Sequence, residues 1–291
     1  MTGSLVVVTD STAGLAAPVA ARAGVEVVPL HVVVGDDEFT EGVDVDRTAL
    51  AASLRKGRVS TSRPSPLAFL TLYERLAQEG ATRIVSAHLS AQLSGTCEAA
   101  RLAARVAPVP VRVVDTGSIA LALGYAVLAG AEAARRVPAG VEATQEEAAD
   151  VADLITRRAA ASQVLVYVHT LEYLRRGGRI GAAASLLGGA LAVKPLVALV
   201  DGHLEPVEKL RTASRALARL VDLTVHAATV APGPVRLAVQ HVEADARAAS
   251  VAAELRAHLP GVEVEVAEVT AVVGVHLGPG MVATVVAPST D

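Results

Sequence analysis

Residues 83–104 read RIVSAHLSAQLSGTCEAARLAA, and this stretch decides the fold of the first part of the chain. Its beginning, Ile84 to Leu89, has the apolar content of a short buried strand. From Glu98 onward, apolar residues recur at helical spacing, which predicts a helix. Between the two lies Leu93-Ser-Gly-Thr96, a turn with two hydroxyl groups that leads directly into the N-terminus of that helix.

This turn has the features of an anion-binding site. A helix N-terminus carries unpaired backbone N–H groups and a partial positive charge. Ser94 adds a neutral donor, and Gly95 allows a ligand to approach the backbone closely. The simpler alternative is that Ser94 or Thr96 only caps the helix, and for an isolated Ser-Gly-Thr sequence that alternative is preferred.

The composition indicates a folded protein that does not bind nucleic acid. The 291 residues are 52% hydrophobic and 19% charged, which excludes disorder and allows two domains. The aromatic fraction is 2% and the net charge is −4, so the chain lacks both stacking surfaces and a basic footprint.

The chain also predicts a cytoplasmic location. A single cysteine cannot form an internal disulfide, and the N-terminal residues lack the pattern of a signal peptide. The most apolar run, Leu186 to Val200, is interrupted by Lys194 and Pro195 and is too short to span a bilayer. We therefore expect no stable membrane insertion.

Strands and helices are predicted to alternate in the first half. Leu5–Val8 and Val111–Val114 have the aliphatic character of strands buried in a sheet. The alternation predicts a parallel sheet with helices on both faces. Because such sheets bind ligands at the carboxyl ends of their strands, the turns at Asp10, Ser94 and Asp115 are expected to lie at one edge.

The second half is predicted to form a separate domain. Val137-Pro-Ala-Gly140 marks the boundary, which gives domains of residues 1–140 and 141–291. Asp201-Gly202 predicts a β-hairpin. Together with Val272–His276, which we expect to be a strand, this indicates a mixed sheet with helices.

Common catalytic motifs are absent. The sequence has no Walker A, His-Glu-x-x-His, Cys-x-x-Cys or Gly-x-Ser-x-Gly motif. What remains is a loop with Thr61 and Ser62, the turn with Ser94, and His276. Each has a structural alternative: polar groups of an ordinary loop for the hydroxyls, and a satisfied core histidine for His276. The arginines around Arg179 are equally compatible with a solvated helix end.

A set of short motifs follows one order from about Leu5 to Val286. They are Thr9-Asp10-Ser11-Thr12, Val28-Pro29-Leu30, Thr61-Ser62-Arg63-Pro64-Ser65, Leu89-Ser90, Leu93-Ser94-Gly95-Thr96, Gly177-Gly178-Arg179-Ile180, Lys194-Pro195, Asp201-Gly202, Arg211-Thr212 and His276-x-Gly-Pro-Gly280. None is specific alone, but this many in one order makes coincidence improbable. Together they resemble the DegV family of bacterial fatty-acid-binding proteins.

The resemblance implies two domains, an α/β/α parallel-sheet domain and a two-layer α/β mixed-sheet domain of the DAK1/DegV-like type. It implies that one long-chain fatty acid, similar to palmitate or oleate, lies between the domains with its chain in an apolar tunnel. Family members present the carboxylate to a separate fatty acid kinase, which makes an acyl phosphate for phospholipid synthesis. A non-catalytic carrier with no metal or further cofactor is therefore expected.

The resemblance also assigns roles to individual positions. The Arg of the Gly-Gly-Arg-Ile motif falls on Arg179, a head-group or partner contact, and the Arg used for docking on the kinase falls on Arg211. The carboxylate contacts of the family fall on Thr61, Ser94 and His276, and we expect Ser62 and Gly95, which lie beside them in the same motifs, to bind the carboxylate as well.

Two departures from the family pattern stand next to these positions. Arg63 replaces the usual Gln, and Cys97-Glu98 replaces Tyr-Gln. Arg63 either adds charge near the head group or points to solvent, whereas we expect Cys97 to pack against the core. The tail requires aliphatic walls, at about 0.8 kcal/mol for each buried CH₂. Residues that any core would also use are candidates for these walls: Leu121, Leu186, Leu187 and Leu191.

Two alternatives to a carrier stay open at this point. In the first, Ser94 is a nucleophile with His276 as its base and Asp10 or Asp115 as orienter, although the turn lacks the strained elbow of nucleophilic serines. In the second, the chain is the substrate-holding subunit of a dihydroxyacetone-kinase-type enzyme, which holds a small polar molecule covalently through a histidine. The apolar composition fits a lipid better.

Overall fold

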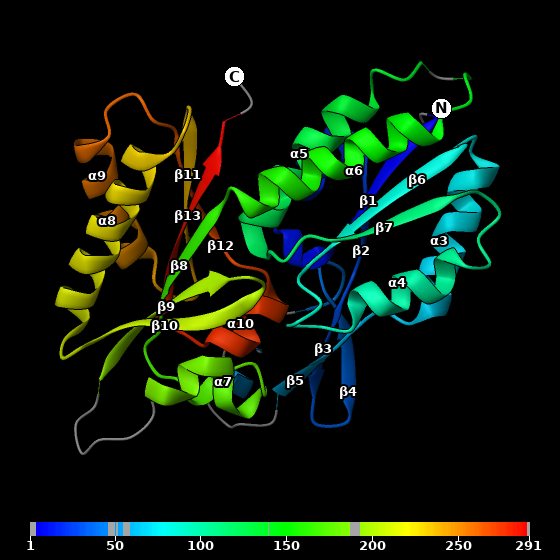
Figure 1. Cartoon of the computed structure of the whole chain (residues 1–291). Coiled ribbons are helices and arrows are strands. Elements are labelled where there is room, and N and C mark those ends of the chain that lie inside the picture. The colour runs from blue at the N-terminus through cyan, green and yellow to red at the C-terminus, as the bar shows by residue number, and fades with distance from the viewer. Residues whose placement is uncertain are drawn as a thin grey trace. The chain divides into compact units, whose positions relative to one another are not determined.

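A computed structural model describes residues 4–45, 50, 52–54, 59–138, 140–186 and 193–289 (Figure 1). Its contacts divide the chain into two compact units. The first contains Met1–Val33, Glu38–Asp44 and Thr61–Ala160, and the second contains Val34–Asp37, Val45–Ser60 and Ala161–Asp291. Helix α6 (Gln145–Ala160) follows the predicted boundary at residue 140, yet it belongs to the first unit because it packs on helix α5 (Ala120–Ala134).

The first unit is built on a parallel sheet, as the alternation of strands and helices predicts. Its strand order is β2-β1-β6-β7, and all neighbouring strands are parallel. The strands are β1 (Leu5–Asp10), β2 (Val25–Val28), β6 (Arg83–His88) and β7 (Val111–Asp115).

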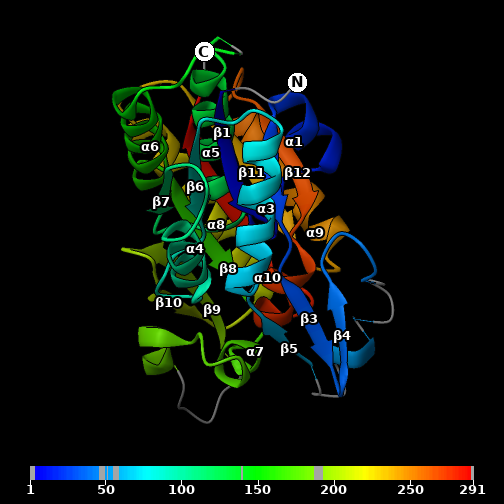
Figure 2. The same ribbon diagram turned by 90° about the vertical axis from the view of Figure 1, so that its right-hand side faces the viewer.

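Helices cover both faces of this sheet (Figure 2). Side chains alternate along β1, so Leu5 and Val7 pack with α5 and α6, whereas Val6 and Val8 pack with helices α3 and α4. Helix α3 (Pro66–Gln78) begins with Ser65 as its N-cap, whose side chain accepts a hydrogen bond from the N–H of Ala68. The remaining helices of this unit are α1 (Ala17–Ala23) and α4 (Thr96–Ala104), with a short 3₁₀ turn at Ser11–Ala13.

The second unit is built on a mixed sheet of order β10-β9-β8-β13-β11-β12. Of the neighbouring strand pairs in this sheet, β11 and β12 are parallel and the other pairs are antiparallel. Asp201 and Gly202 both have positive φ and join β9 to β10, which confirms the predicted hairpin. The strands are β8 (Gln163–Tyr167), β9 (Lys194–Val200), β10 (His203–Leu210), β11 (Val235–His241), β12 (Val264–Glu268) and β13 (Val282–Pro288).

Helices α8 (Ala213–Val230) and α9 (Asp245–His258) pack on this sheet through one apolar cluster. Helix α7 (Glu172–Arg176) ends at Gly177, and a 3₁₀ segment spans Gly181–Leu186. The predicted strand at Val272–His276 is wrong, because these residues form helix α10 (Ala271–Leu277). A short, uninterrupted aliphatic run fits a buried strand and a buried helix equally well.

A third, small sheet has the order β4-β3-β5. It consists of β3 (His31–Val34), β4 (Asp37–Thr40) and β5 (Val59–Ser62). The sequence predicts a loop at Thr61 and Ser62, but pairing in this sheet makes them the end of β5. No helix among the described residues is long and apolar enough to cross a membrane.

Candidate functional site

The turn before α4 is the first part of the candidate site. Gly95 is the N-cap of α4, and within the described residues no side chain makes a capping hydrogen bond to the helix. The hydroxyl oxygens of Ser94 and Thr96 lie 2.9 Å apart and share a hydrogen bond. The capping alternative is therefore wrong for both residues, and the first turn of α4 retains the character of an anion site.

Hydrogen bonds hold this turn against the carboxyl ends of the neighbouring strands. The Asp10 carboxylate accepts a hydrogen bond from the backbone N–H of Leu89 at 3.0 Å. The Asp115 carboxylate accepts one from the N–H of Ala91 at 3.1 Å. Asp10 and Asp115 end strands β1 and β7, so the predicted convergence of strand-end turns at one edge is confirmed.

A Ser-His-Asp chain exists in this unit, but it does not include Ser94. His88 Nδ1 lies 3.1 Å from the Asp10 carboxylate, and its Nε2 lies 2.7 Å from the Ser86 hydroxyl. That hydroxyl also bonds Tyr73 at 2.8 Å. All of these side chains are fully buried, and burial raises the pKa of Tyr73. No substrate reaches the serine, so the chain is a structural network.

The side chain of Cys97 also belongs to the core. It is fully buried, and its thiol lies 3.5 Å from the carbonyl oxygen of Leu89. Burial raises the pKa of this thiol to about 12. A thiol that stays protonated is a poor nucleophile and a poor metal ligand. The burial of the side chain confirms the prediction that Cys97 packs in the core.

Thr61 and Ser62 lie on β5, both half-buried. The Ser62 hydroxyl donates a hydrogen bond to the Glu38 carboxylate at 2.5 Å. A hydroxyl whose proton points at Glu38 offers only its oxygen to a further partner, and oxygen cannot donate to a carboxylate. This bond makes the Ser62 hydroxyl a weak candidate for a donor to a bound carboxylate.

His276 is the centre of the second part of the site, in the last turn of α10. Its ring lies against Gly177, where an added Cβ would be 2.2 Å from Nδ1. Burial, with a contribution from the Arg179 charge, lowers the pKa of His276 to about 4. The imidazole is therefore neutral at pH 7, with one N–H that can donate to an anion.

The loop around His276 depends on a second glycine. Gly278 has φ of 75° and ends α10, and an added Cβ there would lie 2.2 Å from the Tyr173 ring. Arg179 donates a hydrogen bond to the carbonyl oxygen of Gly177. The structure thus brings His276, Arg179 and the glycine pair together within the second unit.

The other arginines occupy exposed positions. Glu172 pairs with Arg175 at 2.7 Å and with Arg176 at 2.7 Å, so these two are the solvated helix-end arginines of the structural alternative. Arg211 is exposed and follows the last residue of β10. Thr212 next to it caps α8 through the N–H of Arg215.

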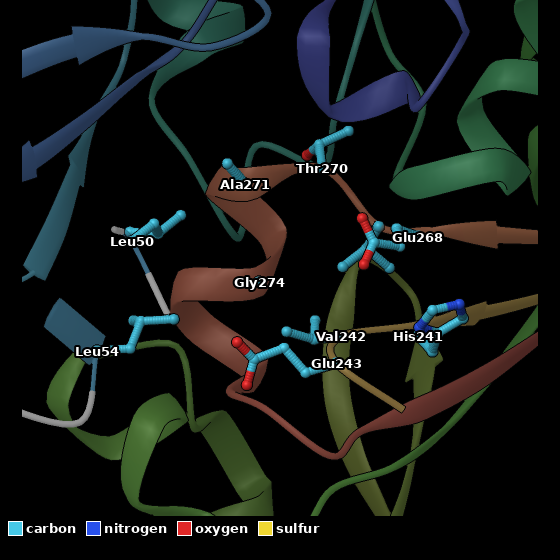
Figure 3. A pocket seen from close by; sticks show the side chains of 10 residues that line it. Leu50, Leu54, His241, Val242, Glu243, Glu268, Thr270, Ala271 and Gly274 are labelled. Atoms are coloured by element: carbon cyan, nitrogen blue, oxygen red, sulfur yellow. The ribbon is translucent and has the colours of Figure 1, made fainter. Parts of the chain in front are cut away.

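One small pocket is lined by residues that are not among the site residues predicted from the sequence (Figure 3). Leu50 and Leu54 lie on one side of helix α10, and His241 and Glu268 on the other. The Thr270 hydroxyl in this lining is buried with no hydrogen-bond partner among the described residues. The volume is about 50 Å³, which accommodates a few water molecules but not a long acyl chain. No sequence pattern points to this pocket.

The suggested walls of a lipid tunnel are only partly visible. Leu121 and Leu186 are both buried, as a tunnel wall or an ordinary core requires. Leu187 and Leu191 lie outside the described residues. Within the described residues, no group of three or more His, Cys, Asp or Glu side chains could hold a metal ion.

Comparison with known proteins decides the family. A family model described as "Uncharacterised protein, DegV family" matches residues 4–289. A DegV domain-containing protein of Streptomyces coelicolor is 51% identical over 98% of this chain and 99% of its own length. The chain belongs to the DegV family. A further DegV domain-containing relative, from Mycobacterium tuberculosis, is 37% identical over 96% of this chain and 95% of its own length.

Solved DegV structures share the whole fold. The structure described as "Fatty Acid Binding of a DegV family Protein from Thermus thermophilus" matches with a TM-score of 0.87 and 31% identity, over 98% of this chain and all of that one. DegV of Bacillus subtilis, described as a fatty acid binding protein, matches with a TM-score of 0.85 and 28% identity over 99% of this chain. The combination of a parallel-sheet domain and a mixed-sheet domain is thus the DegV fold.

Proposed function

We propose that this protein binds one long-chain fatty acid and presents its carboxylate to a separate fatty acid kinase in the cytoplasm. In this proposal Thr61, Ser94 and His276 contact the carboxylate, with Gly95 allowing close approach and Ser62 shaping the adjoining strand. The observation that carries the proposal is the α4 N-terminus, where two hydroxyls are present and no side chain caps the helix.

The chemistry of these groups suits a single carboxylate. Hydroxyl and backbone N–H groups donate hydrogen bonds to an anion without a buried counter-charge. The neutral ring of His276 adds a further donor, because its lowered pKa keeps it unprotonated at pH 7. The descriptions of the Thermus and Bacillus relatives as fatty-acid-binding proteins support a lipid rather than a small polar anion.

The proposed partner of the loaded protein is a separate fatty acid kinase. Arg211 is an exposed cation at the end of a strand, in a position that a partner protein can reach. Arg179 approaches the carbonyl of Gly177 and is the second candidate for a partner or head-group contact. The proposed product is an acyl phosphate made by the kinase and used in phospholipid synthesis, so the chain itself needs no catalytic residue.

Native mass spectrometry of the purified protein tests lipid binding. We expect one fatty acid per chain, identified after extraction by chromatography. Protein that is free of lipid and ignores added palmitate and oleate would contradict the proposal. Addition of a fatty acid kinase and ATP to the loaded protein should then yield acyl phosphate.

Two further assays separate the carrier from the alternatives. A serine hydrolase would react stoichiometrically with a fluorophosphonate probe at Ser94 and turn over short acyl esters. A dihydroxyacetone-kinase-type subunit would show the mass of a small carbonyl compound on His276. We expect neither signal, because the Ser86–His88–Asp10 chain is fully buried, and no hydrogen bond within the described part of the chain joins it to Ser94.

A further inference from the structure

The side chain of Arg63 lies directly against Gly95. A Cβ added to Gly95 would be 1.7 Å from Nη1 of Arg63, 2.9 Å from Cζ and 3.2 Å from Cδ. No real Cβ approaches a neighbour so closely, so the guanidinium occupies the space that any other residue at position 95 would fill. The Arg63 guanidinium therefore lies beside the turn that carries Ser94.

This is an unfavourable position for a cation on its own. Gly95 is the N-cap of α4, and the N-terminus of a helix carries a partial positive charge. Within the part of the chain that the structure describes, Arg63 makes no hydrogen bond or ion pair. Glu98 in the first turn of α4 is exposed and does not pair with it. Two positive electrostatic sources therefore adjoin the same space, and no carboxylate among the described residues pairs with Arg63.

We propose that Arg63 is the counter-ion of the bound carboxylate and makes this protein select ionised fatty acids over neutral lipids of equal chain length. The inference rests on the proposed function, because it assigns specificity to the same site. A guanidinium is always charged and matches a carboxylate with two parallel hydrogen bonds. A glutamine at this position would offer only a neutral amide.

The exposure of Arg63 is consistent with this role. A side chain on the surface of the first unit can keep its charge without the desolvation cost of a buried cation. Gly95 leaves room for that charge beside the turn, because its backbone carries no Cβ. Arg63 and Gly95 thus act as a pair, in which the glycine makes room for the arginine.

The first test measures binding of palmitate and of hexadecan-1-ol to wild-type protein and to Arg63→Gln. We expect wild type to prefer the acid, and the variant to lose about tenfold in palmitate affinity, equivalent to about 1.4 kcal/mol. Affinity for the alcohol should stay the same. Arg105→Gln is the matched control, since it removes an exposed arginine at the opposite end of α4 and should leave both affinities unchanged.

The second test moves the charge instead of removing it. Gly95 has φ of −77°, so alanine adopts this backbone without strain, but its methyl group would collide with the guanidinium. Gly95→Ala should therefore lower the preference for palmitate in the wild-type background. In the Arg63→Ala background the same substitution should have a clearly smaller effect, because there is no guanidinium to displace. Thermal unfolding followed by circular dichroism checks that each variant is folded.

The outcomes separate this inference from the proposed function. If wild-type protein binds no palmitate, the proposed function fails and Arg63 has no carboxylate to pair with. If wild type binds palmitate and Arg63→Gln keeps the same ratio of acid to alcohol affinity, only the role of Arg63 is overturned. An equal effect of Gly95→Ala in both backgrounds would show that Gly95 does not act through Arg63.

Discussion

The ring of His276 packs on the Cα of Gly177, and an alanine methyl at position 177 would lie 2.2 Å from Nδ1 and 2.8 Å from Cε1. Gly177 has φ of −73°, so alanine fits its backbone and only the methyl group is in conflict. The glycine therefore leaves room for the imidazole. Burial and the charge of Arg179 both lower the pKa of this ring.

Gly177→Ala is expected to displace His276. The overpacking should cost about 1–3 kcal/mol of unfolding free energy. Palmitate affinity should fall as well, because the imidazole moves from its position. Urea unfolding and a palmitate titration measure the two effects. Gly233→Ala is the control, since an added Cβ there has nothing within 4 Å and should change neither quantity.

Stability should fall as the pH drops from 6.5 to 4. The unfolded chain takes up a proton on His276 near its ordinary pKa of 6.5, but the folded protein takes it up only near 4. The unfolded state thus binds more protons in this window, and its protonation destabilises the fold. At about 1.4 kcal/mol per pKa unit, His276 contributes about 3 kcal/mol.

Urea unfolding at pH 7 and at pH 4.5 checks this pH dependence. His276→Asn removes the titrating group, so it should reduce the difference in unfolding free energy between the two pH values. An undiminished difference in the variant would mean that other groups cause the acid sensitivity.

Ser94→Ala should weaken palmitate binding about tenfold or more, because a buried carboxylate loses a donor worth about 1–3 kcal/mol. The fold should persist, since Ser94 does not cap α4. Calorimetric titration with palmitate gives the affinity. Ser250→Ala, which removes an exposed hydroxyl on α9, is the control. Wild-type affinity in Ser94→Ala would remove this residue from the site.

Arg211→Ala should leave unfolding free energy within about 0.5 kcal/mol of wild type, because surface changes rarely exceed that value. Lipid binding should also be unchanged. Kinase-dependent formation of acyl phosphate should become slower, and the rate at several carrier concentrations measures the loss. Arg157→Ala removes an exposed arginine from α6 and is the control. Equal rates for the two variants would exclude Arg211 from docking.

Ser86→Ala should destabilise the first unit without a direct effect on the lipid. The substitution leaves His88 Nε2 and the Tyr73 hydroxyl without their shared partner in a sealed interior. We expect a loss of about 1–3 kcal/mol in urea unfolding. Palmitate affinity of the folded protein should stay at the wild-type level, and a large loss there would connect this network to the site.

Local patterns predict those parts of the fold that depend on local chemistry. The residues of β1, β6 and α4 follow from buried aliphatic runs and helical spacing, and Asp201-Gly202 fixes its hairpin because both residues adopt positive φ. The helix at Ala271–Leu277 is not predictable in this way, because it is apolar on all sides and its burial comes from its surroundings.

The same distinction between local patterns and contacts of distant residues applies to the candidate site. Ser94 is identifiable because the turn and the helix after it are contiguous in the sequence. The contact of Gly177 with His276, and the bond from Ser62 to Glu38, join residues that are distant in the chain. Spacing carries no information on such contacts, so the neutral state of His276 and the weaker candidacy of Ser62 emerge only from the fold.

The contact between Arg63 and Gly95 has an evolutionary consequence. A methyl group at position 95 would force the flexible end of Arg63 to move, so the two sites are expected to vary together among relatives. A relative with both alanine at position 95 and arginine at position 63 should hold the guanidinium elsewhere, whereas a shorter residue at 63 removes the conflict. Selection for arginine at position 63 should therefore also restrict position 95, although glycine has no side-chain functional group.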